Sequence, residues 1–190
     1  MVAERNPLLT REEYLAFERA SDTRHEYVAG EVVAMTGASR RHSLIQSATL
    51  TSLNLQLWGR PCEVHGSDLR VKIAALGIYT YPDITVVCGE PILEDNERDT
   101  LLNPLVLIEI LSPSTERYDR RLKFQRYRHI PSFREYLLIA QDRPRVERYT
   151  RLEDDTWPLV VHEGLNAAVT LDTLGCTLAL GDIYHRVAFA

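Results

Sequence analysis

Two short apolar runs of the sequence each carry a single acidic residue. The run YTYPDITVVCG, residues 79–89, contains Asp83, and the run NPLVLIEILSPST, residues 103–115, contains Glu109. Runs of this length and composition favour buried strands. Taken singly, Asp83 could cap a turn after Pro82 and Glu109 could pair with a basic side chain. Two acids in successive strands point instead to a site that does chemistry, because a buried carboxylate is costly unless something compensates its charge.

The two-residue period of a strand decides whether these acids can meet. Asp83 shares a face with Thr85, and Glu109 shares a face with Leu107 and Leu111. If the two strands are neighbours, as sequential strands commonly are, both carboxylates can project from the same side of the sheet. Protonation of one acid, pairing with arginine, or a divalent cation would each relieve their repulsion. An oxygen-rich pair suits Mg²⁺ or Mn²⁺, with water completing the coordination.

The flanking sequence predicts the elements that must position these strands. Thr10 and Glu13 have capping-box spacing, which predicts a helix over residues 11–19. The stretch HEYVAGEVVAMTG predicts a hairpin with Gly30 at a positive-φ turn position. Residues 40–58 contain neither Gly nor Pro and carry apolar side chains on two sides. This pattern predicts a long helix that is covered on two sides.

The second half of the chain predicts further elements of the same sheet. After the second acidic run we expect a turn, a basic helix to about His129, and a strand–turn–strand unit over 134–151. Short β-rich runs beyond Thr156 predict hairpins that cover the sheet. The order favours an α/β fold with a mixed β-sheet core flanked by helices and β-hairpin additions at both ends. We expect a single domain over 1–190, with a core at about 40–150, an N-terminal helix and hairpin at 10–36, and a C-terminal β-rich extension at 152–190.

Charge is distributed unevenly along the chain. The net charge is −5, yet the segment from Arg117 to Arg151 holds 11 of the 22 basic residues and four acids, so it carries +7 and the remainder −12. A phosphate-facing surface and a solvated arginine-rich helix and hairpin both fit this asymmetry. The chain has 20 arginines and two lysines, Lys72 and Lys123. A lysine kept where arginine is the usual cation hints at a chemical role.

The three cysteines and the N-terminus predict a cellular location. Cys62, Cys88 and Cys176 are widely spaced and odd in number, a pattern that favours reduced thiols over a disulfide framework or a zinc site. The first residues lack an apolar signal core, and no run of about 18 apolar residues occurs. We therefore expect a cytoplasmic protein without a membrane span. A Cys–His hydrolase using Cys62 or Cys88 with His65 has no motif to support it.

The pieces YPDITVVCG, PLVLIEILSPST and DRRLKFQRY together resemble the PD-(D/E)XK phosphodiesterase superfamily, which has the restriction-endonuclease-like fold. More closely, the chain resembles the Uma-type family of restriction-endonuclease-like bacterial proteins from about Thr10 to Tyr149. Pro82-Asp83 matches the PD, Glu109 the acidic position and Ile110 the X. The lysine position holds Leu111, which departs from the motif.

The resemblance implies that a lysine of the following helix takes over the role of the missing one. Lys123 fits that place, four residues before Tyr127, and Lys72 is the competing candidate. A Mg²⁺ or Mn²⁺ ion held by Asp83, Glu109 and the carbonyl of Ile110 would activate water against a DNA phosphodiester, with Lys123 orienting or helping to deprotonate that water. The possible supporting residues are Glu26, Glu31, His42, Gln125 and Tyr127. The residues expected to hold the DNA backbone are Arg120, Arg121, Arg126 and Arg128.

Two further expectations concern activity and assembly. The principal expectation is a metal-dependent endonuclease that acts on DNA. The alternative is a catalytically inactive protein of the same fold that serves as a DNA-binding or oligomeric interaction module. The two-sided helix at 40–58 predicts a homodimer.

Overall fold

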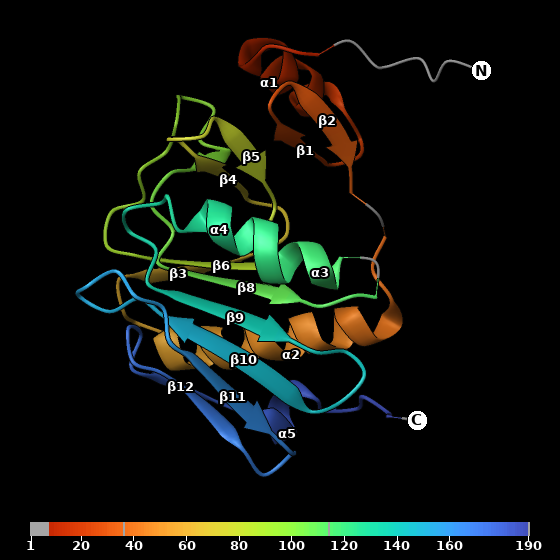
Figure 1. The fold of residues 1–190 in the computed structure, drawn as a ribbon, viewed down its shortest axis with the longest axis vertical. Helices are drawn as coiled ribbons and strands as arrows, with labels where there is room; N and C mark the ends of the chain where they lie inside the picture. The colour runs from red at the N-terminus through yellow and green to blue at the C-terminus, as the bar shows by residue number, and fades with distance from the viewer. Residues whose placement is uncertain (1–7, 36, 114, 190) are drawn as a thin grey trace.

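The computed structural model describes residues 8–35, 37–113 and 115–189, and its centre is a six-stranded mixed sheet (Figure 1). The strand order is β11-β10-β9-β8-β6-β3. Neighbouring strands are antiparallel except β8 and β9, which run parallel. The bounds are β3 Cys62–Gly66, β6 Ile84–Cys88, β8 Val106–Ile110, β9 Glu135–Ile139, β10 Arg145–Thr150 and β11 Leu159–Glu163. This mixed sheet with flanking helices confirms the predicted fold class.

A second, five-stranded sheet carries the N-terminal part of the chain, with strand order β2-β1-β5-β4-β7. Its strands are β1 His25–Val28, β2 Glu31–Ala34, β4 Arg70–Ile73, β5 Ile78–Thr80 and β7 Thr100–Leu101. The helix α1, Arg11–Ala20, precedes β1. The predicted capping box between Thr10 and Glu13 is present at the start of α1. Gly30 has φ 92° at the turn of the predicted hairpin, a value that glycine adopts without strain.

Helices cover both faces of the six-stranded sheet (Figure 1). On one face lies α2, Arg40–Leu57, and on the other lies a continuous helical segment. That segment comprises α3 Glu116–Tyr118, the π-helical turn η1 Asp119–Lys123 and α4 Phe124–Tyr127. The pleat of β8 divides its side chains between two cores. Ile108 joins the core that includes Ile45 of α2, whereas Leu107 joins the core that includes Tyr127.

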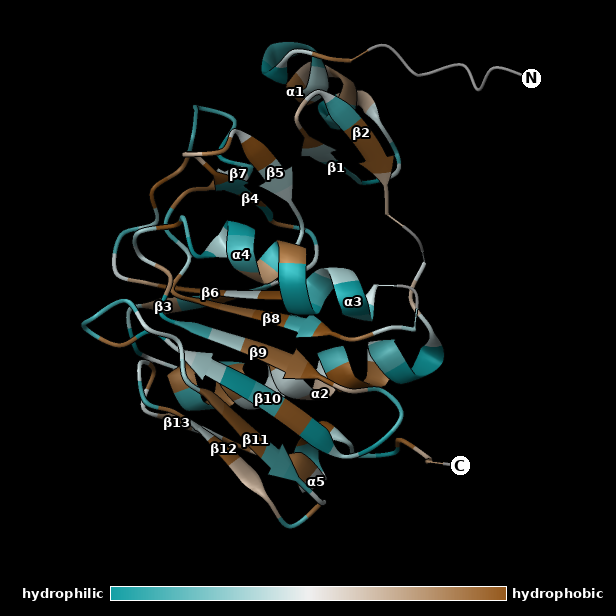
Figure 2. Ribbon diagram, in the orientation of Figure 1, coloured by the Kyte–Doolittle hydropathy of each residue, from teal (hydrophilic) through white to brown (hydrophobic). Residues whose placement is uncertain are grey.

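The C-terminal residues extend the sheet and also cover it. β11 adds an edge strand beside β10, and the hairpin of β12 Ala168–Leu171 and β13 Cys176–Ala179 packs with α5 Leu180–Ile183 against the α2 side. The hydropathy colouring shows apolar residues on the strands of the central sheet (Figure 2). The prediction of covering hairpins is therefore right for β12–β13, whereas β11 enlarges the sheet itself.

The structure contradicts the prediction that all three cysteines are reduced thiols. Cys62 on β3 and Cys88 on β6 are directly paired in the antiparallel register and form a disulfide. Cys176 is free and buried. The spacing of the cysteines gave no sign of this bond, because only the register of β3 against β6 brings the two sulfurs together. Among the described residues, no helix has the length and apolarity that crossing a bilayer requires.

Candidate active site

The register of β6 and β8 brings the two acids to facing positions. Ile84 pairs with Ile108 in this antiparallel ladder, so one further step along it sets Asp83 opposite Glu109. Directly opposed residues of antiparallel strands share a face. The charge of Asp83 also acts on the carboxyl of Glu109, in the direction that raises its pKa. The structure thus brings together the pair on which the sequence argument depends.

Glu109 is a buried carboxyl with two close partners. Its Oε1 lies 3.1 Å from Nζ of Lys123 and accepts a hydrogen bond of 2.8 Å from the hydroxyl of Tyr127. Burial raises the pKa of Glu109 well above its usual value, and although Lys123 opposes this shift, the charges of Asp83 and Asp119 add to it. Glu109 therefore retains a proton more readily than an exposed glutamate does.

Lys123 lies at the centre of the acidic cluster. Besides Glu109, its Nζ lies 3.2 Å from Oε1 of Glu26 and 3.8 Å from Oδ1 of Asp119. Burial by itself would lower the pKa of this ammonium group, but the surrounding negative groups, led by Glu109, hold it well above its usual value. Lys123 is therefore a protonated cation at neutral pH. The three contacting carboxyls and nearby Asp83 present more negative charge than one ammonium can neutralise, which suits a divalent cation.

The helical segment that follows β8 places the lysine. Asp119, Lys123 and Tyr127 recur at intervals of four residues, so they lie one turn apart on the inward side of the segment. The turn from Asp119 to Lys123 is π-helical, a conformation that occurs often at functional sites. Leu111, at the motif position where a lysine is usual, is buried in the same core as Tyr127.

The second lysine lies in a different environment. Lys72 on β4 forms an ion pair with Glu94, and the hydroxyl of Tyr79 donates to the same carboxylate at 2.8 Å. Neither Asp83 nor Glu109 is among the ion-pair partners recorded for Lys72 within the described residues. Of the two candidates, Lys123 is the one that the structure brings to the paired acids.

The N-terminal hairpin contributes one acid from the second sheet. Glu26 on β1 contacts Lys123, and its Oε1 accepts a hydrogen bond from the hydroxyl of Thr80 on β5. The Thr80 hydroxyl also lies 3.4 Å from that of Tyr127. The pairing of Val28 with Glu31 sets Glu31 on the same face as Glu26, but Glu31 is exposed at the turn. Asp119 and Thr80 were missed by the sequence argument, although the four-residue spacing before Lys123 could have indicated Asp119.

Asp83 is held by backbone and side-chain donors. Its Oδ2 accepts a hydrogen bond of 2.7 Å from the N–H of Ile110 and lies 3.1 Å from Nε2 of His42. The side-chain amide of Gln46 donates to the Asp83 carbonyl at 2.8 Å. His42, predicted as a possible phosphate or metal contact, is therefore a partner of Asp83. These contacts fix the orientation of the carboxylate toward the end of β8.

The remaining oxygens fit a hydrated divalent cation. Among the described residues, no hydrogen bond uses Asp83 Oδ1 or Glu109 Oε2. The N–H of Leu111 donates to the carbonyl of Ile139 on β9. Because successive residues of a strand direct their backbone N–H and C=O groups to alternate sides, those of Ile110 point toward Asp83. No group of three His, Cys, Asp or Glu side chains within the described ranges forms a ready metal cage. Two carboxylates, one carbonyl and several waters match the usual Mg²⁺ sites in proteins.

The predicted DNA-contacting arginines divide into two pairs. Arg120 forms ion pairs with Glu116 and Glu147, and Arg126 donates to the hydroxyl of Tyr118 at 2.6 Å. Arg121 and Arg128 are exposed, and no ion pair is recorded for either within the described residues. Gln125 is also exposed and has no recorded hydrogen bond within those residues, so it does not support the acidic cluster.

Comparison with known proteins identifies the family. The family model of Uma2, described as "Putative restriction endonuclease", matches residues 11–181. The chain belongs to the Uma2 family. This result confirms the resemblance seen in the PD, EILSPST and lysine-bearing segments.

Two proteins of Synechocystis are similar to this chain over nearly their whole length. Uncharacterized protein slr1290 of Synechocystis sp. (strain ATCC 27184 / PCC 6803 / Kazusa) is 35% identical over 183 residues, which cover 96% of this chain and 95% of that protein. Uncharacterized protein sll1609 of the same strain is 37% identical over 169 residues, with 89% and 96% covered. The crystal structure of a putative nuclease belonging to DUF820 from Anabaena variabilis ATCC 29413 has a TM-score of 0.76 at 21% identity, with 95% and 99% covered. This last similarity establishes the shared fold.

Proposed function

We propose that this Uma2-family chain is a metal-dependent endonuclease that hydrolyses phosphodiester bonds in DNA. The observation that carries the proposal is the 3.1 Å approach of Lys123 Nζ to Glu109, on a strand whose register sets Glu109 opposite Asp83. Membership of a family described as "Putative restriction endonuclease" supports the same activity. In this proposal Asp83, Glu109 and Lys123 are the catalytic residues.

The residues divide the chemistry between them. Asp83, Glu109 and the carbonyl of Ile110 would hold Mg²⁺ or Mn²⁺. Such an ion, when bound, would polarise the phosphate and lower the pKa of a water molecule. A carboxyl must be deprotonated to bind a metal ion. Because burial raises the pKa of Glu109, metal binding would have to displace a proton that this carboxyl retains. Lys123 keeps its proton at Nζ, so it orients water and offsets negative charge on the phosphate rather than acting as the base.

The supporting groups position this ammonium. Glu26, with its oxygen held by Thr80, and Tyr127, which donates to Glu109, restrict where Lys123 can lie. We propose that the exposed Arg121 and Arg128 contact DNA phosphates, since Arg120 and Arg126 already have partners within the chain.

Cleavage assays on plasmid and linear DNA test the proposal directly. We expect nicking or cutting with millimolar Mn²⁺ or Mg²⁺, none with EDTA, and none in Asp83→Asn or Lys123→Met. Lys72→Met is the matched control, because it removes the chain's other lysine, which is partly buried and pairs with Glu94 outside the cluster. Equal cleavage by wild type and Asp83→Asn would refute the proposed centre.

The alternative is a DNA-binding or oligomeric protein of this fold without catalysis. It predicts DNA binding that survives EDTA and is unchanged in Asp83→Asn. It also predicts no gain in thermal stability from Mn²⁺, whereas a metal-binding centre gains stability from a cation that binds only the folded state.

We infer further that the chain works as a homodimer in the cytoplasm, where two centres could act on both strands of a duplex. The disulfide between Cys62 and Cys88 makes the compartment testable, because cytoplasmic thiols are normally kept reduced. Thiol-trapping of the protein in rapidly lysed cells would measure its state there, and a fully oxidised pair would argue against the cytoplasm.

A further inference from the structure

The helix α2 has an unusual outer surface. Between Ser43 and Gly59 the sequence contains no acidic or basic residue and no histidine, although 26% of the whole chain is charged. A helix that covers one face of a sheet normally turns charged residues toward water. Here the outward positions are filled by Ser, Thr, Asn, Gln, Leu and Trp.

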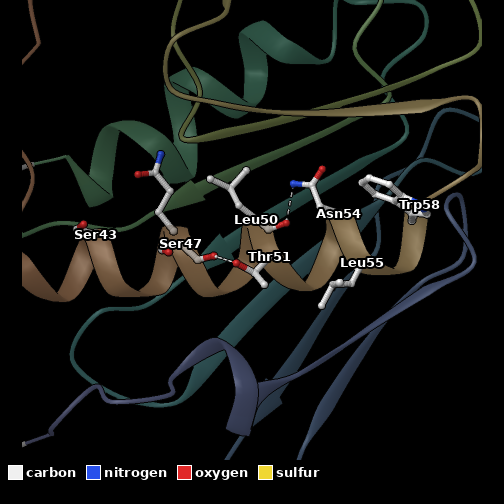
Figure 3. Close-up of a pocket in the computed structure, with 8 residues that line it drawn as sticks. Ser43, Ser47, Leu50, Thr51, Asn54, Leu55 and Trp58 are labelled. Atoms are coloured by element: carbon white, nitrogen blue, oxygen red, sulfur yellow. Dashed lines mark hydrogen bonds between the residues drawn. The ribbon is translucent and has the colours of Figure 1, made fainter.

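Two large apolar side chains stand out on this surface. Trp58 is 86% exposed and Leu55 is 73% exposed. Leu55 and Trp58 help to line a shallow hollow along the helix, together with Ser47, Leu50, Thr51 and Asn54 (Figure 3). Figure 3 shows Leu50, Asn54 and Trp58 along one side of α2, with Leu55 on another.

Leu50 packs against the core of the chain, whereas Leu55 and Trp58 are exposed and do not belong to it. Ile45, Leu53 and Leu57 form the buried side of α2. The side toward the C-terminal hairpin is also occupied, because Gln56 exchanges two hydrogen bonds with the backbone of Thr177. The two covered sides predicted for this helix are therefore the sheet and the β13 hairpin, and the surface around Leu55 and Trp58 remains uncovered.

We propose that a second copy of this chain packs on the outer surface of α2, so that the two α2 helices meet across a two-fold axis. In such an interface each residue near the axis meets the same patch of its partner, so a charge there would oppose its own copy. A charge-free surface with an exposed tryptophan suits this arrangement, since interface centres are depleted of charge and rich in aromatic anchors. This proposal specifies which surface forms the interface of the homodimer inferred above. It does not depend on whether the chain cleaves DNA.

Other occupants fit this surface less well. DNA requires lysine or arginine against its phosphates, and residues 43–59 have neither. A membrane-surface helix combines an apolar face with a strongly charged one, whereas the exposed positions of α2 are mostly small polar residues.

The edge of the central sheet extends the same surface. A helix of 18 residues is about 27 Å long and about 10 Å wide. Its outer face of roughly 270 Å² is therefore smaller than the roughly 800 Å² per partner of a stable interface. β3 adjoins α2 and is an edge strand of the six-stranded sheet, so its free backbone edge supplies additional contact area.

The opposite edge of the sheet provides a matched control. On β11, Leu159, Val160 and Val161 are between 41% and 46% exposed, but this strand also ends at Glu163, which is paired with Arg145. Val161→Glu therefore introduces the same charge into a comparable apolar edge away from α2.

Sedimentation equilibrium of the wild type, Leu55→Glu, Trp58→Glu and Val161→Glu tests the proposal. We expect a wild-type mass of twice 21.8 kDa, and a dissociation constant raised at least about 30-fold by Leu55→Glu or Trp58→Glu. Val161→Glu should stay dimeric. Circular dichroism will verify that the variants fold. Because Leu55 and Trp58 are exposed, their substitution should leave the fold intact. A monomeric wild type, or a dimer lost only in Val161→Glu, would overturn the α2 interface whatever the cleavage assays give.

Discussion

Removing the ammonium of Lys123 gives the sharpest test of the acidic cluster. In Lys123→Met, the carboxyls of Glu109, Glu26 and Asp119 lose their common cation. Two unit charges about 3.1 Å apart at an effective dielectric constant of about 20 attract by roughly 5 kcal/mol. Much of this attraction is offset by desolvation, and breaking a buried pair from one side costs about 3–5 kcal/mol. We expect the free energy of unfolding at pH 8 to fall by that amount.

The size of this loss should depend on pH in a defined direction. Burial raises the pKa of Glu109, and Lys123 is the group that opposes the shift, so the pKa rises further in Lys123→Met. A folded-state pKa above the unfolded value means that the folded protein keeps a proton that the unfolded chain releases. Stability is then lost as the pH rises from the ordinary carboxyl pKa through the folded one. Wild type and Lys123→Met share this loss up to the folded pKa of the wild type, so the difference in stability between them should be smaller at pH 5 than at pH 8.

Urea denaturation followed by circular dichroism at both pH values measures these quantities. Glu109→Gln should restore part of the stability in the double variant, with a coupling of about 1–3 kcal/mol. Lys72→Met breaks a single pair with Glu94 and should cost less, about 1–3 kcal/mol, without changing cleavage. If Lys123→Met loses less than about 0.5 kcal/mol at pH 8, or more at pH 5 than at pH 8, the buried cluster described here is wrong.

Three shorter predictions address metal, DNA and the disulfide. Calorimetry should show tighter Mn²⁺ binding at pH 8 than at pH 6, because Glu109 must release a proton that burial retains; equal affinity would contradict that raised pKa. Arg121→Ala and Arg128→Ala should each reduce the slope of log affinity for DNA against log salt by about one, as measured by fluorescence anisotropy, and unchanged slopes would remove both from the DNA surface. Reducing the bond between Cys62 and Cys88, 26 residues apart, should lower the unfolding free energy by up to about 3.5 kcal/mol, and an unchanged urea midpoint would show that the bond does not constrain the unfolded chain.

Local patterns in the sequence determined most of the elements. The capping box at Thr10 and Glu13 gave α1, and the turn at Gly30 gave the first hairpin. The two-residue period also set Glu109 on the face of β8 that it occupies, beside Leu107. These features depend on residues a few positions apart, which is why the sequence alone was sufficient for them.

Only the tertiary structure decided which distant residues meet. The sequence left Lys72 and Lys123 as rival lysines, and the packing of the helical segment over β8 brought Lys123 to Glu109. The register of β3 against β6 joined Cys62 to Cys88, contrary to the sequence prediction. Periodicity fixes the direction of a side chain within its own element, but contact between elements depends on strand order, register and helix packing, which short-range patterns do not encode.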